Sequence, residues 1–207
     1  MVRRRSRLTR RRSSYRSFAS LERDLRVCRA CTEAGFHLES RPVLNDYVGQ
    51  RAYMYGQAPG VVEGNERRPW RGRAGKTLRR WLELDEEEFY GAFYCGSVTR
   101  CYPGRAPSGR GDRTPTLREQ ELCSFWRHWE LNLLQPELIV PVGGLAIRRL
   151  LGLSGLADCI GRTFEHEGAV VVPLPHPSGA SSWLNAPANR ELAAAAARLV
   201  RVELARL

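Results

Sequence analysis

The sequence contains only one lysine, Lys76, although 33 of its 207 residues are Lys or Arg. Such a preference for arginine is typical of GC-rich coding sequences, but codon usage does not account for the shortage of acidic residues. The chain has 22 Asp and Glu residues, which leaves a formal net charge of +11 and an isoelectric point near 10.0. This imbalance favours a polyanionic partner, and nucleic acid is the simplest one.

Long apolar runs are also missing. No stretch approaches the ~18 apolar residues that a membrane-spanning helix requires, and the arginine-rich N-terminus lacks the apolar region of a secretory signal. The longest apolar stretches, residues 138–142 and 169–173, have the length of buried strands. We therefore expect no membrane partner and a cytoplasmic, nucleoid-associated protein.

The length of the chain suits one ordinary domain with a sizeable core. Arginines crowd the first 17 residues, where no acidic residue balances them. We predict a disordered basic arm over residues 1–17 and one folded domain over residues 18–207. The arm either tethers the protein to phosphates or is a solvated tail.

Hydrophobic periodicity and turn residues predict alternating strands and helices. We expect a helix that begins at an N-cap Ser20 and runs into Cys28 and Cys31, and a helix over 117–134 that is capped by Thr116. Further helices are predicted over residues 73–84, 143–151 and 187–205, and strands over residues 51–56, 92–99, 138–142, 162–166 and 169–173. This alternation indicates an α/β fold with a mostly parallel central sheet. In such folds ligands bind at the carboxyl ends of the strands.

The segment after the first predicted strand has residues suited to a ligand. Gly56, Pro59 and Gly60 let the backbone turn sharply and approach a ligand closely. Farther along, Trp70 lies among arginines and offers an aromatic face to a nucleobase, while cations outside steer phosphates. The simpler alternative is a loop with a core tryptophan.

A second loop follows the last predicted strand and contains His176 between two prolines. A histidine restrained in this way can donate a hydrogen bond to a developing negative charge. The alternative is a loop histidine whose hydrogen bonds are satisfied locally.

The six cysteines are not expected to form a disulfide framework, because no secretory signal is present. Cys28 and Cys31 are separated by two residues, and together with Cys101 and Cys123 they can close a four-thiolate site. The spacing is compatible with structural zinc, with a 4Fe–4S cluster, or with no cofactor.

Together these segments resemble the iron–sulfur uracil-DNA glycosylases of families 4 and 5. Residues 56–78 (GQAPGVVEGNERRPWRGRAGKTL) resemble the first family 4 motif, GEAPG-x2-ED-x2-G-x-PF-x-G-x-AG. Residues 94–103 (YCGSVTRCYP) resemble the family's strand that ends in Lys-Cys-Arg-Pro-Pro, and residues 176–178 resemble its His-Pro motif, with a serine as in family 5. The resemblance covers about residues 20–205.

The resemblance implies a three-layer α/β/α sandwich, a monomer, and excision of a damaged base that is flipped out of DNA. It implies a 4Fe–4S cluster on Cys28, Cys31, Cys101 and Cys123. By position it assigns catalysis to His176, Gln57 and Glu63, base binding to Gly56, Ala58, Pro59, Trp70 and Ser97, and DNA contacts to Arg100, Arg105, Arg110, Arg113, Ser178, Gly179, Ala180, Ser181 and Ser182.

The sequence departs from the family 4 pattern at positions that carry chemistry. Gln57 replaces a Glu and cannot act as a general base, which leaves Glu63 as the nearest carboxylate. Gly64 replaces an Asp, and Arg67 replaces a Gly. Ser97 replaces the Asn that reads the base, and a bidentate contact of that kind contributes about 1–3 kcal/mol of discrimination. We therefore expect broadened specificity or lost activity.

The segment between Cys101 and Cys123 is longer than in family 4, and it is either an extra DNA-contacting loop or a solvated one. It contains no histidine, so we do not expect the covalent trapping of DNA that one related group performs. Three functions remain: a glycosylase for uracil or another deaminated base such as hypoxanthine, a non-catalytic iron–sulfur DNA-binding protein, and an unrelated zinc-containing nucleic-acid module.

Overall fold

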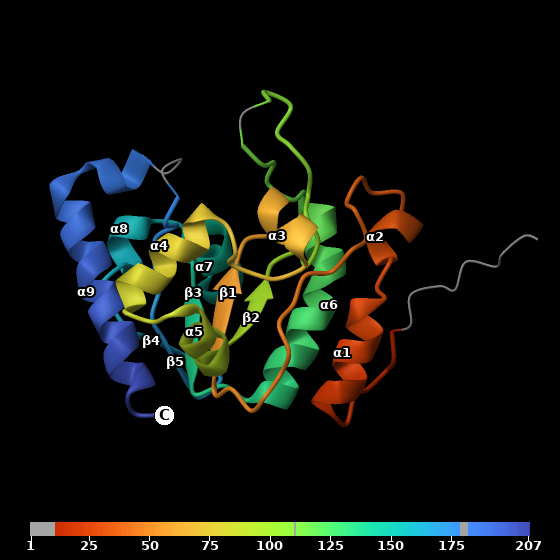
Figure 1. Ribbon diagram of the computed structural model, residues 1–207, viewed down its shortest axis with the longest axis horizontal. Helices are drawn as coiled ribbons and strands as arrows, with labels where there is room; N and C mark the ends of the chain where they lie inside the picture. Colours follow the sequence, from red (N-terminus) through yellow and green to blue (C-terminus); the bar gives the residue numbers. More distant parts are fainter. Residues whose placement is uncertain (1–10, 110, 179–181) are drawn as a thin grey trace, which may run out of the picture.

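The chain folds around a five-stranded β-sheet in a computed structural model, which describes residues 11–109, 111–178 and 182–207 (Figure 1). The strands are β1 (Ala52–Gly56), β2 (Phe93–Ser97), β3 (Leu138–Pro141), β4 (Phe164–His166) and β5 (Ala169–Val171), in the order β2-β1-β3-β5-β4. All neighbouring strands are parallel except the edge strand β4, which is antiparallel to β5. The predicted mostly parallel sheet is confirmed.

Helices cover both faces of the sheet. They are α1 (Phe18–Arg26), α2 (Ala30–Glu33), α3 (Val61–Glu66), α4 (Arg73–Leu82), α5 (Glu86–Ala92), α6 (Leu117–Leu134), α7 (Gly144–Leu151), α8 (Leu156–Cys159) and α9 (Pro187–Leu204), with a 3₁₀ turn η1 (Ser182–Asn185) before α9. Figure 1 shows α1 and α6 on one side of the strands and α4 and α9 on the other. None of the described helices has the length and apolar character needed to cross a bilayer.

The layers follow from side-chain alternation along the strands. On β1, Tyr53 and Tyr55 pack into a core with α1 and α6, whereas Ala52 and Met54 pack into a second core with α4, α5 and α9. All five residues of β1 are buried, as expected for a central parallel strand covered on both faces. The fold is therefore the three-layer α/β/α sandwich implied by the resemblance.

Most predicted elements are present with shorter ends, but the first helix differs. Its N-cap is Ser17, whose side chain accepts a hydrogen bond from the backbone N–H of Ser20, so the predicted N-cap at Ser20 is wrong. The helix ends at Arg26, and Cys31 lies in the separate helix α2. Thr116 caps α6 through a capping box with Glu119, as predicted.

Part of the predicted disordered arm is folded. Tyr15 is buried among aromatic residues of α6, with its ring centroid 5.6 Å from that of Trp129. Arg12 forms an ion pair with Asp24 of α1, with 2.8 Å between Nε and Oδ2. The buried aromatic ring and this ion pair hold residues 11–17 against the domain. The predicted disordered arm over residues 1–17 therefore extends too far toward the C-terminus. Residues 1–10 lie outside the described part of the chain.

Candidate functional site: a cavity at the carboxyl ends of β1 and β2

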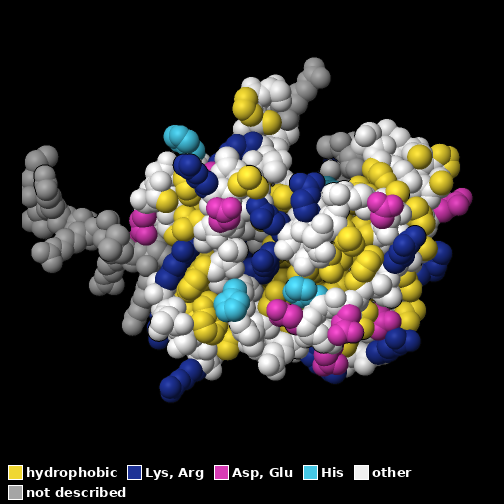
Figure 2. Space-filling view, turned by 180° about the vertical axis from the view of Figure 1, so that it is seen from behind, with side chains coloured by type: hydrophobic (Ala, Val, Ile, Leu, Met, Phe, Trp, Pro, Cys, Tyr) yellow, Lys and Arg dark blue, Asp and Glu magenta, His cyan; other side chains and the backbone are white. Residues whose placement is uncertain are grey.

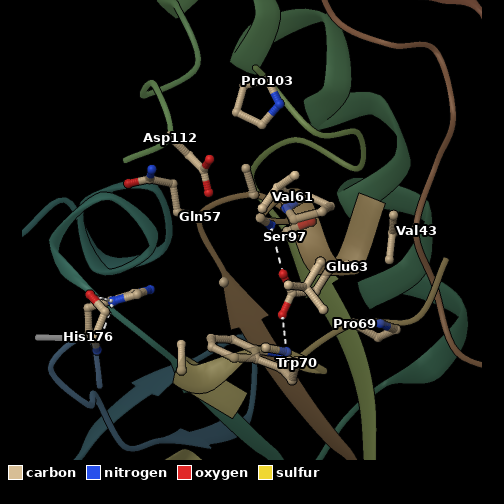
Figure 3. Close-up of a pocket in the computed structure, with 18 of the residues that line it drawn as sticks. Val43, Gln57, Val61, Glu63, Pro69, Trp70, Ser97, Pro103, Asp112 and His176 are labelled. Carbon is tan, nitrogen blue, oxygen red and sulfur yellow. Dashed lines mark hydrogen bonds between the residues drawn. The ribbon is translucent and has the colours of Figure 1, made fainter. Parts of the chain in front are cut away.

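A cavity of about 460 Å³ opens at the carboxyl ends of β1 and β2 (Figure 3). It lies where ligands bind in parallel α/β sheets. Its lining includes all eight residues predicted for catalysis and base binding: Gly56, Gln57, Ala58, Pro59, Glu63, Trp70, Ser97 and His176. Gly56 and His176, which lie far apart in the sequence, are thus brought to one cavity.

The floor of the cavity is held by parallel backbone pairing that continues past the strands. Val98 N donates to Gly56 O at 2.9 Å, and Thr99 N donates to Gln57 O at 3.1 Å. The Ser97 hydroxyl donates its only proton to Thr99 O at 2.8 Å. Ser97 therefore presents only lone pairs to the cavity, and it can accept a hydrogen bond from a ligand but not also donate one.

Trp70 forms one wall of the cavity in a left-handed backbone conformation, with a φ of 58°. Such a φ is unfavourable for a non-glycine residue, and neighbouring contacts hold it. Arg79 Nη1 donates to Trp70 O at 2.9 Å, and α4 approaches so closely at Gly75 that a Cβ there would overlap the Trp70 carbonyl. A Cβ at Gly56 would lie 3.0 Å from the indole ring, so glycine at this position makes room for it.

The arginines beside Trp70 make ion pairs within the protein. Arg71 pairs with Glu66 and Glu86, and Arg68 lies near Glu86 with its guanidinium 4.1 Å from the centroid of Tyr90. Arg68 and Arg71 thus both lie close to Glu86, at the N-terminus of α5. These contacts hold the loop that carries Trp70 against the body of the protein.

Glu63 is also a structural residue in this arrangement. Its Oε2 accepts from Gly60 N at 3.1 Å, and its Oε1 accepts from Gly72 N at 2.7 Å, as the dashed lines in Figure 3 show. One carboxylate therefore joins the loop after β1 to the start of α4. Both oxygens accept hydrogen bonds from backbone N–H groups, which gives Glu63 a positioning role for the two loops. The catalytic role expected for Glu63 stays a prediction.

His176 lies in the cavity wall with its two ring nitrogens in different environments. Ser178 N donates to Nδ1 at 3.3 Å, and the Ser178 hydroxyl lies 2.8 Å from the same nitrogen. Because a backbone N–H can only donate, Nδ1 must be an acceptor and the proton of the neutral ring resides on Nε2. Burial lowers the pKa of His176 below its usual 6.5, although the negative charge of Glu63 opposes this effect. A neutral imidazole with an Nε2–H donor results.

Seven of the nine residues predicted to contact DNA fall into three groups. Arg105 is exposed on a hairpin, and Ser182 is exposed at the start of η1. Arg110, Gly179, Ala180 and Ser181 lie outside the described residues. Ser178 is hydrogen-bonded to His176.

One predicted DNA contact is wrong. Arg100 is buried, with 2% of its side chain exposed, and pairs with the buried Glu130 of α6, so it does not reach a phosphate. Arg113 donates two hydrogen bonds of 2.7 Å to the carboxylate of Glu119 and also lines the cavity. Its expected DNA contact stays a prediction.

Sequence reasoning missed other residues that line the cavity. Val43 comes from the extended segment before β1, where its N–H donates to Arg100 O. Arg73 is exposed at the start of α4, and Asp112 belongs to the hairpin of the long loop before α6. The extra length of that loop was noticed in the sequence, but nothing in it singled out one carboxylate.

The four predicted ligand cysteines surround a narrow hollow that shares no lining residue with the cavity among those described. Cys28 and Cys31 come from the α1–α2 region, Cys101 follows β2 and Cys123 lies in α6, and all four are buried. Burial, followed by the charges of the other three cysteines, raises the pKa of the Cys101 thiol. The four sulfur atoms are therefore close enough to influence one another.

The chemistry around these sulfur atoms suits bound thiolates. Trp126 Nε1 donates to Cys28 Sγ at 3.3 Å, and Arg100 N donates to Cys123 Sγ at 3.4 Å. Hydrogen bonds of this kind stabilise and tune iron–sulfur clusters. Within the described part of the chain, no group of three or more His, Cys, Asp or Glu side chains is arranged to hold a metal ion.

Comparison with known proteins places the chain in a family. The sequence model of the Uracil DNA glycosylase superfamily matches residues 46–199. The chain is 29% identical to a Type-4 uracil-DNA glycosylase of Thermotoga maritima over 119 residues, which make up 56% of this chain and 58% of that protein. It is 22% identical to a Type-4 uracil-DNA glycosylase of Sulfurisphaera tokodaii over 177 residues, 79% of this chain and 76% of that protein.

A DNA polymerase of Bacillus phage SP01 is also similar, with 26% identity over 133 residues, which cover 62% of this chain and 13% of the polymerase. The match to the Thermotoga protein spans little more than half of that protein's length. The superfamily match nevertheless covers most of this chain and includes both loops that form the cavity. The chain therefore belongs to the Uracil DNA glycosylase superfamily.

Proposed function

We propose that the protein is a DNA glycosylase that hydrolyses the N-glycosidic bond of uracil or another deaminated base flipped out of DNA. The observation that carries this proposal is the state of His176, a neutral imidazole whose Nε2–H has no partner among the described residues, in a cavity walled by Trp70. As the glycosidic bond breaks, its electron pair remains on the base, and Nε2–H donates to the resulting anion. Trp70 offers a ring face on which the flipped base stacks.

Ser97 supports deaminated bases as the substrate class. Deamination turns an amino group beside an accepting ring nitrogen into a carbonyl beside a ring N–H, in uracil as in hypoxanthine and xanthine. An acceptor-only Ser97 is complementary to this N–H and not to the bare ring nitrogen of cytosine or adenine. Without the donor that an Asn amide adds, the site discriminates less between one deaminated base and another.

We further propose a 4Fe–4S cluster on Cys28, Cys31, Cys101 and Cys123. Their burial around one hollow and the two N–H donors to sulfur support this assignment. When bound, the cluster supplies a cross-link between chain segments at a distance from His176. Exposed basic residues favour DNA as the partner, and Figure 2 shows several Lys and Arg side chains on the surface below the projecting hairpin.

The test is base release from labelled oligonucleotides that contain uracil, hypoxanthine or xanthine, single-stranded and opposite each base, followed by alkaline cleavage of abasic sites. We expect release from at least one deaminated base and none from cytosine or adenine. His176→Ala should lower the single-turnover rate by about 10²–10³-fold, the effect typical of losing one donor to a developing anion. Glu87→Gln, an exposed change on α5, is the matched control and should cleave like wild type. If cluster-loaded protein binds DNA but releases no base, the non-catalytic alternative is correct.

A further inference from the structure

Two carboxylates line the cavity among the described residues, Glu63 and Asp112. Both oxygens of Glu63 accept backbone hydrogen bonds, and Gln57 cannot take up a proton. Asp112 differs from both. Its Oδ1 accepts from the Tyr102 hydroxyl at 2.9 Å, while its Oδ2 has no hydrogen-bond or ion-pair partner in the described part of the chain. One carboxylate oxygen at the cavity is thus available to a ligand or a water molecule.

Asp112 is held in place by a hairpin whose described residues are 104–109 and 111–113, and which projects at the top of Figure 1. Arg105 and Asp112 form an antiparallel bridge, Ala106 N donates to Gly111 O at 3.0 Å, and Arg113 N donates to Gly104 O at 2.9 Å. The side chain of Arg113 then fastens the hairpin to α6 through Glu119. The carboxylate is therefore supported on both sides by backbone pairing and by the Tyr102 hydroxyl.

The same contacts bring Asp112 to the loop that departs from the family 4 motif. A Cβ built on Gly60 would lie 3.2 Å from Asp112 Oδ2. Asp112 and Gln57 both line the cavity that Trp70 and His176 also line (Figure 3). A carboxylate thus lies beside Gly60, in the same loop in which the motif has lost one at Gln57.

We propose that Asp112 is the general base that activates the hydrolytic water in this protein, in place of the carboxylate absent at Gln57. The inference rests on the glycosylase function proposed above. The glycosidic bond breaks with its electron pair on the base, and Asp112 Oδ2 takes one proton from a water molecule whose oxygen bonds to C1′ of the sugar. The base anion gains a proton from solvent, and Asp112 returns its proton to solvent. The products are the free base and a sugar with a hydroxyl group at C1′.

The amide of Gln57 has a complementary task in this arrangement. A Gln side chain offers one oxygen acceptor and two N–H donors, so it orients a water molecule without accepting its proton. Proton uptake and orientation are then divided between two residues from different segments. Tyr102 is a positioning residue, because its hydroxyl fixes the Asp112 carboxylate and does not reach the substrate itself.

The experiment measures single-turnover release of whichever base the wild-type protein excises, with protein in excess and at saturating concentration. Asp112→Asn keeps an oxygen that accepts from Tyr102 and removes only the proton-accepting charge. We expect a rate loss on the order of 10²-fold, the lower range for general base catalysis, without weaker DNA binding. Formate should restore part of the rate of Asp112→Ala, because a free carboxylate enters the vacated space, and it should not restore His176→Ala. Glu87→Gln, which also removes one negative charge, should not slow release.

Two outcomes would overturn the inference while the proposed function stands: Asp112→Asn that releases base at the wild-type rate, or Asp112→Ala that is slow and does not respond to formate. The second outcome would assign Asp112 a structural role in the hairpin. A wild-type protein that releases no base from any substrate would overturn both the proposed function and this inference.

Discussion

The two ring nitrogens of His176 differ in protonation, and the hydrogen bond from Ser178 sets which one carries the proton. Ser178 N occupies Nδ1 as a donor, which leaves the ring proton on Nε2. Close packing supports this orientation, since a Cβ at Gly143 would lie 3.3 Å from His176 Cβ, and Gly143 has a φ of +87° that favours glycine. His176 is thus oriented by a serine two residues later and by a glycine at the start of α7.

This arrangement makes a prediction about pH. Burial lowers the pKa of His176 below the usual value of about 6.5, so the ring stays neutral from alkaline pH down past 6.5 and protonates only at lower pH. Protonation places a hydrogen on Nδ1 that opposes the Ser178 N–H, and stability is therefore lost as the pH falls through this range. NMR titration of the ring should show the Nε2–H tautomer and a midpoint below the usual value of about 6.5, with His176→Gln to assign the signal. An Nδ1–H tautomer or a midpoint above 6.5 would contradict the structure.

Between elements, a buried ion pair joins the end of β2 to α6. Arg100 pairs with Glu130, whose other oxygen accepts from the Tyr53 hydroxyl of β1 at 2.7 Å. Arg100 also donates to the carbonyl of Cys95. Both members of the pair are almost fully buried, so each depends on the other for compensation of its charge. The guanidinium that the sequence assigned to DNA thus holds the sheet to its helical layer.

Removal of one partner should be costly, and removal of both much less so. Arg100→Met leaves Glu130 charged and unpaired, and we expect it to lower the unfolding free energy by about 3–5 kcal/mol. The double variant Arg100→Met/Glu130→Leu should recover much of this loss, as measured by urea unfolding. A double variant no more stable than the single one would argue against a charge-pair explanation.

The salt dependence of DNA binding distinguishes a buried ion pair from a phosphate contact as the role of Arg100. Arg100→Met protein that remains folded should keep the wild-type salt dependence of DNA affinity, since Arg100 does not reach a phosphate. Arg105→Met on the exposed hairpin is the matched comparison and should reduce the slope of log K against log salt by about one if Arg105 contacts a phosphate. A reduced slope in Arg100→Met would restore the DNA-contact assignment.

Across the whole molecule, the four cysteines connect the N-terminal segment to the rest of the sandwich. Cys28 and Cys31 belong to that segment, whereas Cys101 follows β2 and Cys123 lies in α6. A cluster bound by all four therefore cross-links segments that are far apart in the sequence. The cavity with His176 lies apart from these sulfur atoms, since the two hollows share no lining residue among those described.

Loss of one ligand should remove the cluster and loosen this connection. Cys101→Ser should lose the broad absorption near 400 nm that thiolate-bound iron produces, along with iron and sulfide, and its thermal midpoint should fall. Cys159→Ser is the matched control, because Cys159 is buried in the other core and faces none of the four. Colourless wild-type protein with full zinc occupancy would overturn the cluster assignment.

Periodicity along the chain was enough to predict an α/β fold with a mostly parallel sheet, since side-chain periodicity follows backbone geometry. The loops after two predicted strands indicated a ligand site with Gly56, Trp70 and His176, because ligands bind at the carboxyl ends of parallel strands. The resemblance to a known family added Ser97 and the third layer. Motifs and periodicity depend on local spacing, which a single sequence contains.

The partners of the charged side chains could be identified only in the folded structure. Glu63, Arg100 and Arg113 have the residue types expected of a base and of phosphate contacts, and each of them has partners inside the protein. No sequence motif marks Asp112. The fold of its hairpin places it close to Gly60 and Tyr102. The sequence gives the charge of a side chain, whereas long-range packing determines which group it pairs with. That partner determines whether the charge is available for catalysis.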